Sequence, residues 1–134
     1  MGHDHIDPSY HKWISGWPSR NLDVVLMGED GVVERFLRYS AGADVAVVEG
    51  VIGLYDSVDG VSELGSTAQV AKLLKAPVVL VLNGDRVNRT LRAVVRRLKA
   101  FDPSVAIPGV ILTRVALGPG GEACQVPPRG RGRY

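Results

Sequence analysis

Two carboxylates and two glycines follow one apolar run and form the segment best suited to chemistry. The run Val45–Val48 leads into Glu49 and Gly50, and Gly53 and Asp56 come shortly afterwards. Open α/β sheets bind ligands where their buried strands end, and glycines there let the backbone approach a phosphate. Carboxylate oxygens are ligands that Mg²⁺ prefers. The pattern favours a Mg-nucleotide site, although a strand followed by a solvated glycine turn has the same appearance.

A second cluster of ionisable side chains lies near the start of the chain. It contains His3, Asp4, His5, Asp7 and His11. Histidines and carboxylates together are able to hold a divalent metal, but this spacing matches no standard zinc pattern and no cysteine lies nearby. Asp4 and Asp7 are better suited to Mg²⁺, which takes hard oxygen ligands.

A basic stripe is a third candidate. Arg86, Arg89, Arg92 and Arg96 recur every three or four residues, as on one side of a helix. Such a stripe can bind nucleic acid, but it is more often the solvated face of an amphipathic helix. We favour the solvated face, with Val87, Leu91, Val94, Val95 and Leu98 on the opposite side.

Composition limits the classes of protein that fit. The chain has 134 residues with 46% hydrophobic and 22% charged residues, as expected for one globular domain or part of one. A net charge of +2 is too small to argue for a nucleic-acid partner, and no apolar run is long enough to span a membrane. The single cysteine, Cys124, excludes an internal disulfide. A cytoplasmic location is expected, with no membrane partner.

The elements that must position these residues alternate along the chain. Helices are predicted at residues 31–40, 66–75 and 87–101, and strands at residues 44–49, 78–82 and 110–113. Ser66 is the predicted N-cap of the second of these helices. Strands that are apolar throughout and separated by helices predict an α/β fold, a parallel sheet with helices on both faces. Residues 116–134, rich in Gly, Pro and Arg, are predicted to be disordered.

The predicted nucleotide site lacks a phosphate cradle of its own. No G-x-x-x-x-G-K-[ST] motif occurs in the sequence, and no G-x-G-x-x-G motif follows a predicted strand.

Four strings nevertheless give the sequence a specific resemblance. They are GHDHIDP at residues 2–8, PSRNLD at 18–23, GADVAVVEGVIGLYD at 42–56 and GSTAQVAKLLKAPVVLV at 65–81. In this order and at this spacing, residues 2 to about 115 resemble the ATP-binding synthetase domain of cobyrinic acid a,c-diamide synthase. Residues 1–115 are therefore interpreted as a partial synthetase domain, followed by the tail at 116–134.

The resemblance implies a P-loop fold of the dethiobiotin-synthetase type and a role in cobalamin biosynthesis. It implies that ATP, with Mg²⁺, phosphorylates a side-chain carboxylate of the corrin substrate. Ammonia released from glutamine by another domain then attacks the acyl phosphate and forms an amide. Phosphoryl transfer is needed because a free carboxylate is a poor acylating agent.

The resemblance also assigns roles to individual residues. It implies Asp4 and Glu49 as metal ligands, and Asp7, Glu49 and Asp56 as catalytic residues. It implies Asn21, Ser66, Thr67 and Thr113 as residues that bind substrate or nucleotide. The sequence departs from the family at His5, where a Tyr is usual, and at Thr113, where an Asn is usual.

The strings of the family that carry the phosphate loop and the glutaminase are missing from the sequence. We therefore expect an internal part of a larger amidoligase that binds ATP weakly, is inactive alone and associates with itself. Two other classes stay open, a non-catalytic binding module with a nucleotide-binding fold and a regulatory protein of the partition-ATPase kind.

Overall fold

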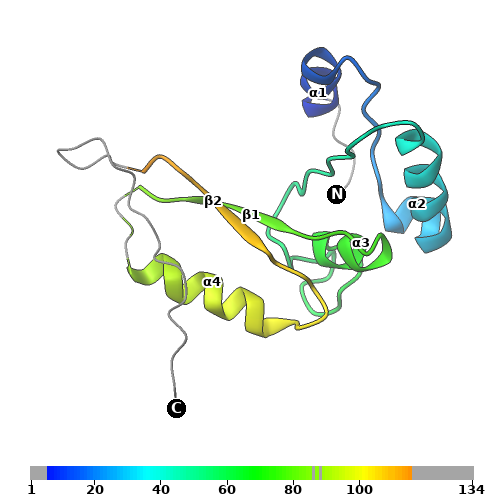
Figure 1. Ribbon diagram of the computed structural model, residues 1–134. Coiled ribbons are helices and arrows are strands. Elements are labelled where there is room, and N and C mark those ends of the chain that lie inside the picture. The colour runs from blue at the N-terminus through cyan, green and yellow to red at the C-terminus, as the bar shows by residue number, and fades with distance from the viewer. Residues whose placement is uncertain (1–5, 86, 88, 116–134) are drawn as a thin grey trace. The chain divides into compact units, whose positions relative to one another are not determined.

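The computed structural model describes residues 6–85, 87 and 89–115, which fall into two compact units, Met1–Pro77 and Val78–Tyr134 (Figure 1). The described part of the first unit contains three helices, α1 (Asp7–Ser15), α2 (Val24–Ser40) and α3 (Thr67–Leu73). The described part of the second contains β1 (Val79–Asn83), α4 (Arg89–Phe101) and β2 (Gly109–Thr113).

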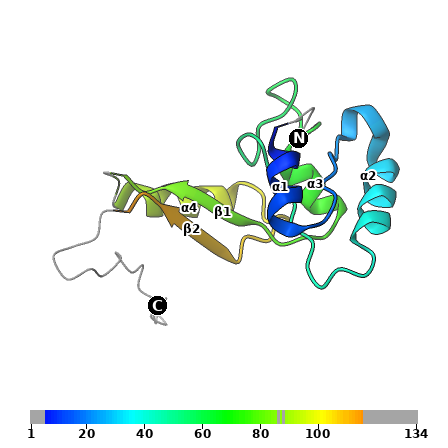
Figure 2. The same cartoon turned by 90° about the horizontal axis from the view of Figure 1, so that it is seen from above.

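The core of the first unit is small and lies between α2 and α3, which lie side by side in Figures 1 and 2. Its buried residues are Leu22, Val24, Val32 and Val70. Met27, Phe36, Leu73 and Leu74 are partly buried against them. Apolar residues spaced three or four apart give each helix one face for this core, and burial of that face supplies most of the helix's stability.

Helix α2 includes the predicted helix at residues 31–40 but begins earlier, at Val24. Asp23 explains the earlier start, because its Oδ1 accepts hydrogen bonds from the amides of Val25 and Leu26 at 2.9 and 3.1 Å. This N-cap satisfies donors that the first turn leaves unpaired. The helix is interrupted at Gly28, whose φ of 69° and ψ of 174° suit almost no residue but glycine.

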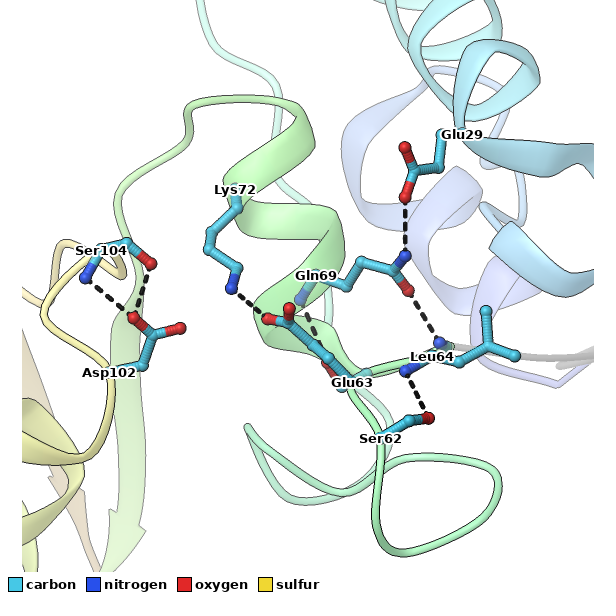
Figure 3. Close-up of polar contacts among 10 residues, drawn as sticks. Glu29, Ser62, Glu63, Leu64, Gln69, Lys72, Asp102 and Ser104 are labelled. Carbon is cyan, nitrogen blue, oxygen red and sulfur yellow. Dashed lines mark hydrogen bonds and ion pairs between the residues drawn. The ribbon is translucent and has the colours of Figure 1, made fainter.

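Helix α3 confirms the predicted helix and its N-cap, within the narrower bounds Thr67–Leu73. Ser66 is fully buried, and its Oγ accepts a hydrogen bond from the Gln69 amide at 3.1 Å. Figure 3 shows the Gln69 side chain between α2 and the loop before α3. Its Nε2 donates to Glu29 Oε1 at 2.9 Å, and its Oε1 accepts from the Gly65 amide at 2.8 Å. Gln69 therefore links two helices and one loop.

The second unit is a β-α-β arrangement. β1 and β2 pair in parallel, with Val79 opposite Gly109 and Asn83 opposite Thr113, and α4 connects them (Figure 1). The strands predicted at residues 78–82 and 110–113 are thus confirmed with their parallel pairing, and the fold is of the α/β class. Leu80 is buried, whereas Val79, Val81 and Ile111 are at least half exposed.

The predicted amphipathic character of α4 is confirmed in its main features. Leu91, Val95 and Leu98 are partly buried, whereas Arg89, Arg92 and Arg96 are exposed. Val87 and Val94 are also exposed, so their assignment to the apolar side was wrong. Arg86 lies outside the described residues. No helix in the described ranges is long and apolar enough to cross a membrane.

The strand predicted at residues 44–49 was wrong. This segment runs without strand pairing, and Val45 and Val47 are 76% and 89% exposed. A run of β-branched residues becomes a strand only when a neighbouring strand pairs with its backbone and other elements cover its side chains. The described residues of the first unit contain no other strand to do so. Helix α1, by contrast, was not foreseen, although Pro8 in its first turn is a common helix start.

Candidate functional site

A hollow of about 90 Å³ in the first unit brings together three segments that are distant in sequence. They are the first half of α1, the segment before α2, and the extended segment around Glu49. Asp7, Asn21 and Glu49, all predicted as site residues, line it together with His11 and Arg20. Two carboxylates, an amide, an imidazole and a guanidinium therefore share one small space.

An ion pair joins two of the lining residues, one on α1 and one on the extended segment. His11 Nε2 lies 2.7 Å from Glu49 Oε2, and His11 Nδ1 lies 3.3 Å from Ser19 Oγ. The side chains of His11 and Glu49 are 42% and 53% exposed. Each ring nitrogen of His11 therefore has a partner, so Glu49 and the Ser19 hydroxyl together fix the orientation of the ring. His11 therefore positions the carboxylate of Glu49.

Gly50 places the next part of this segment against the start of α3. A Cβ added at Gly50 would lie 2.8 Å from both Cγ2 and Oγ1 of Thr67, so only glycine fits without displacement. This packing brings Ser66 and Thr67, both predicted as binding residues, close to the residue after Glu49. Thr67 Oγ1 is buried and has no hydrogen-bond partner within the described structure. A buried hydroxyl in this state is a costly feature that usually has a reason.

Asp56 belongs to a neighbouring turn rather than to the lining of the hollow. Its Oδ2 accepts a hydrogen bond from the Gly53 amide at 3.1 Å, and its own amide donates to the Gly53 carbonyl at 3.2 Å. The turn is attached to α3, because the Ala68 amide donates to the Leu54 carbonyl at 2.9 Å. Asp56 is exposed, and its carboxylate is hydrogen-bonded within this turn.

The remaining predicted site residues lie elsewhere. Thr113 ends β2 in the second unit, where its hydroxyl donates to the Leu82 carbonyl at 3.4 Å. Asp4, with His3 and His5, lies outside the described residues. The predicted position of Glu49 at the end of a buried strand was wrong, because contacts with His11 and the packing of Gly50 hold it instead.

The loop that leads into α3 contains a carboxylate with a clearly perturbed pKa. Hydrogen bonds from Ser62, and then from the Val61 amide, hold the pKa of the Asp59 carboxyl well below its usual range. The amides of Val61 and Ser62 both donate to its Oδ1, at 2.9 and 2.8 Å. Asp59 is therefore a structural carboxylate that orders this exposed loop.

The donor set in the hollow suits a hard cation that brings further ligands with it. Mg²⁺ is commonly held by one or two carboxylates together with water and phosphate oxygens. Asp7, Glu49 and Asn21 supply oxygens of this kind. Across the described ranges, no three or more His, Cys, Asp or Glu side chains gather closely enough to hold a metal ion by themselves. The residues therefore fit a Mg-nucleotide better than a dedicated metal centre.

Sequence reasoning missed the basic side chains that gather beside this site. The Cζ atoms of Arg20, Arg35 and Arg38 lie 5.0, 6.0 and 5.7 Å from the centre of the Tyr39 ring. Arg35 and Tyr39 are four residues apart on α2, so the spacing of this pair was a usable signal once the helix was known. Arg20 reaches the same ring from the segment that lines the hollow. That tertiary contact has no sequence signature.

Known proteins resemble this chain strongly over most of its length. It is 53% identical over 115 residues to a cobyrinate a,c-diamide synthase of Archaeoglobus fulgidus, covering 86% of this chain and 25% of that protein. It is 52% identical over 116 residues to a hydrogenobyrinate a,c-diamide synthase of Streptomyces coelicolor, covering 87% and 24%. A cobyrinate a,c-diamide synthase of Methanosarcina acetivorans is 49% identical over 115 residues, covering 84% and 23%.

The resemblance inferred from the four strings is therefore confirmed, and the chain spans about a quarter of the length of these relatives. No protein-family model matches the chain. No solved structure matches it either.

Proposed function

We propose that this chain, a relative of the cobyrinate a,c-diamide synthases, serves cobalamin biosynthesis as part of the synthetase region of an ATP-dependent amidoligase. In the proposed reaction, a corrin carboxylate attacks the γ-phosphorus of ATP, giving an acyl phosphate and ADP. Ammonia derived from glutamine attacks the acyl carbon, phosphate leaves, and an amide remains. The proposal includes a cytoplasmic location and residues 1–115 as part of a P-loop domain of the dethiobiotin-synthetase type.

The observation that carries the proposal is the convergence of Asp7, Asn21 and Glu49 on one hollow. The resemblance implies roles for all three, and they come from separate segments. Negative charge would repel a phosphoryl donor unless a cation accompanied it, so the two carboxylates suit a nucleotide bound with Mg²⁺. In that arrangement Asp4 and Glu49 would hold the ion, which would neutralise charge on the phosphates.

The residues around Glu49 have defined tasks in this scheme. His11 holds the Glu49 carboxylate at one oxygen, Oε2, which leaves Oε1 available for a further ligand. A carboxylate fixed in this way needs less reorganisation when charge develops on the substrate. Thr67 offers a buried hydroxyl that forms no hydrogen bond within the described structure, so it suits a phosphate or substrate oxygen. Asp56 and Thr113 are proposed to contact substrate and nucleotide.

A segment exchange tests the proposal. The 115 residues of the Archaeoglobus fulgidus enzyme that match this chain are replaced with those of this chain, to which they are 53% identical. ATP-dependent conversion of cobyrinate to its a,c-diamide is then measured with glutamine and with ammonia. We expect a working enzyme, because the exchanged segment supplies equivalent residues at equivalent positions.

Two variants of the exchanged enzyme sharpen the result. Glu49→Gln keeps the shape of the side chain and removes its charge, and should lower kcat by about a hundredfold or more, the scale for one preorganised electrostatic contact. Glu34→Gln, at an exposed position on α2, removes the same charge and should change kcat less than about twofold. A folded exchanged enzyme that hydrolyses glutamine but forms no diamide would contradict the proposal.

A further inference from the structure

We infer that Arg20, Arg35 and Arg38, gathered around Tyr39, form a carboxylate-binding site that holds a side chain of the corrin which is not being amidated. The inference rests on the proposed function and adds to it a substrate-positioning site. It concerns only the first unit, where all four residues lie.

The first observation is an accumulation of like charge. Three guanidinium groups lie within 6.0 Å of one ring centre, and they come from two different segments. Within the described residues, ion pairs join His11 to Glu49 and Lys72 to Glu63, and neither involves these arginines. Like charges held together destabilise a fold unless something offsets them. An anion that binds among them would remove that repulsion.

The second observation is that the guanidinium groups remain able to donate. A guanidinium over an aromatic ring uses its flat face for the cation–π contact and keeps its N–H donors at the edge. In Arg20, one Nη1 donor serves the Ser19 carbonyl at 3.1 Å, which leaves other donors for a ligand. Edge donors of this kind match the two oxygens of a carboxylate. Tyr39 is 44% exposed, so a ligand reaches the cluster from solvent.

The third observation is continuity with the candidate site. Arg20 lines the hollow that contains Asp7, Asn21 and Glu49, and it also lies over the Tyr39 ring. The hollow thus contains two carboxylates, and Arg20 joins it to the cluster of arginines around Tyr39. An anionic substrate needs both, because its reacting carboxylate must meet the phosphoryl donor while its other charges are neutralised.

The chemistry of the relatives supplies a ligand with these properties. Their names describe products amidated at two positions, a and c, so their substrates carry at least two carboxylates. While one carboxylate reacts, the other remains an anion on the same rigid macrocycle. Bound by the arginines, it would orient the reacting one toward Glu49 and lower the entropy cost of reaction.

The test is direct binding to the 134-residue chain. Isothermal titration calorimetry measures Kd for cobyrinic acid with the wild type, with Arg20→Gln/Arg35→Gln/Arg38→Gln, and with Arg89→Gln/Arg92→Gln/Arg96→Gln. Both triple variants lose three positive charges, but the second takes them from exposed positions on α4. We expect the first variant to bind at least about tenfold more weakly and the second to stay within about twofold of the wild type.

Further arms identify the chemistry and guard against misfolding. The variant Arg20→Lys/Arg35→Lys/Arg38→Lys keeps the charge but loses the planar fork, and should bind with intermediate affinity. The fully methyl-esterified corrin has no carboxylates and should bind all variants equally weakly. Inorganic phosphate and ATP serve as competitors, and a phosphate site is indicated if they displace the corrin through these arginines. Circular dichroism checks that α2 persists.

Each outcome decides the matter. Four outcomes would overturn the inference. They are equal affinity of the wild type and the first variant, equal losses of affinity in both triple variants, no binding of cobyrinic acid by the wild type, and a phosphate site. The segment exchange described above is independent of these titrations. If the exchanged enzyme is active but corrin binding does not depend on the arginines, the proposed function holds and the carboxylate site does not. If corrin binding depends on the arginines but the exchanged enzyme is inactive, only the carboxylate site holds.

Discussion

Two apolar runs of similar composition have different structures in this chain. Residues 44–49 read DVAVVE and residues 78–82 read VVLVL. The second run forms most of β1 and pairs in parallel with β2, whereas the first stays extended without a partner. Val47 is 89% exposed, but Leu80 is 7% exposed. Strand formation is thus a property of a pair of segments and their cover, and β propensity alone does not determine it.

The two runs also differ in the contacts that the polar residue at the end of each run makes. β1 ends at Asn83, whose Oδ1 accepts from the Asp85 amide at 2.9 Å, a local contact within one turn. The other run ends at Glu49, which contacts His11, a residue far away in sequence. The unpaired run is therefore placed by side-chain contacts at its end, and the paired run by its ladder.

The largest expected effect compares the two runs directly. Leu80→Ala removes a buried side chain from β1 and should lower the free energy of unfolding by about 2–5 kcal/mol. Val47→Ala removes an exposed side chain and should change it by less than about 0.5 kcal/mol. Urea titrations followed by circular dichroism measure both. A Val47→Ala cost similar to that of Leu80→Ala would mean that the first run is buried after all.

The glycines beside the two runs give the next comparison. Gly50→Ala would place a Cβ 2.8 Å from the Thr67 side chain, and we expect a loss of about 1–3 kcal/mol from overpacking. At Gly109, opposite Val79 in β2, the nearest atom to an added Cβ is 3.9 Å away, so Gly109→Ala should be neutral or slightly stabilising. Thermal unfolding of both variants distinguishes these results, and equal melting temperatures would contradict the packing of Gly50 on Thr67.

A smaller effect is expected at Ser66, the N-cap of α3. The first unit needs this cap because its described residues contain no strand pairing. Ser66→Ala removes the acceptor for the Gln69 amide and should cost about 1 kcal/mol. Ser66→Asn offers another side-chain acceptor but is larger, and the site is fully buried, so it should recover only part of the loss. Chemical denaturation gives the three values. An unchanged free energy of unfolding in Ser66→Ala would show that the cap does not stabilise α3.

The smallest effect concerns pH and the loop before α3. Folding holds the pKa of Asp59 below its ordinary value through hydrogen bonds from Ser62 and the Val61 amide. The folded state therefore favours the ionised form, so the stabilisation is present above the ordinary pKa of about 3.9 and is lost as the pH falls below it. Melting temperatures between about pH 5 and pH 2 should fall more steeply in the wild type than in Asp59→Asn. Parallel curves would contradict this role.

Much of the fold was predictable because its signals are local. The N-cap at Ser66, the amphipathic pattern of α4 and the apolar runs of β1 and β2 depend on residues a few positions apart. The first run, residues 44–49, was wrongly predicted to be a strand, because its own sequence does not show whether another strand pairs with it or other elements cover its side chains. Helix α1 was missed although Tyr10, Trp13 and Ile14 are spaced as on one side of a helix; all three are exposed, and the helix has no buried residue.

The candidate site also has one part that was predictable from the sequence and one part that was not. The convergence of Asp7, Asn21 and Glu49 agrees with roles implied by resemblance, but neither spacing nor composition predicts that His11 holds Glu49. The contact of Arg20 with Tyr39 was also not predictable, because Arg20 reaches this ring through the tertiary fold. The roles of all the predicted site residues stay predictions, namely those of Asp4, Asp7, Asn21, Glu49, Asp56, Ser66, Thr67 and Thr113.

The interruption of α2 at Gly28 has a consequence for amide hydrogen exchange. A helix normally protects its amides as one cooperative unit, and a break in the ladder divides that unit. The turn from Val24 to Met27 is held by the Asp23 cap and the Met27–Asp23 backbone hydrogen bond at 3.1 Å. We therefore expect its amides to exchange as a unit separate from the helix after Gly28, at the cost of exposing the buried Val24 side chain. Because Asn21 and Leu22 line the hollow, each opening would loosen that wall and admit solvent or ligand.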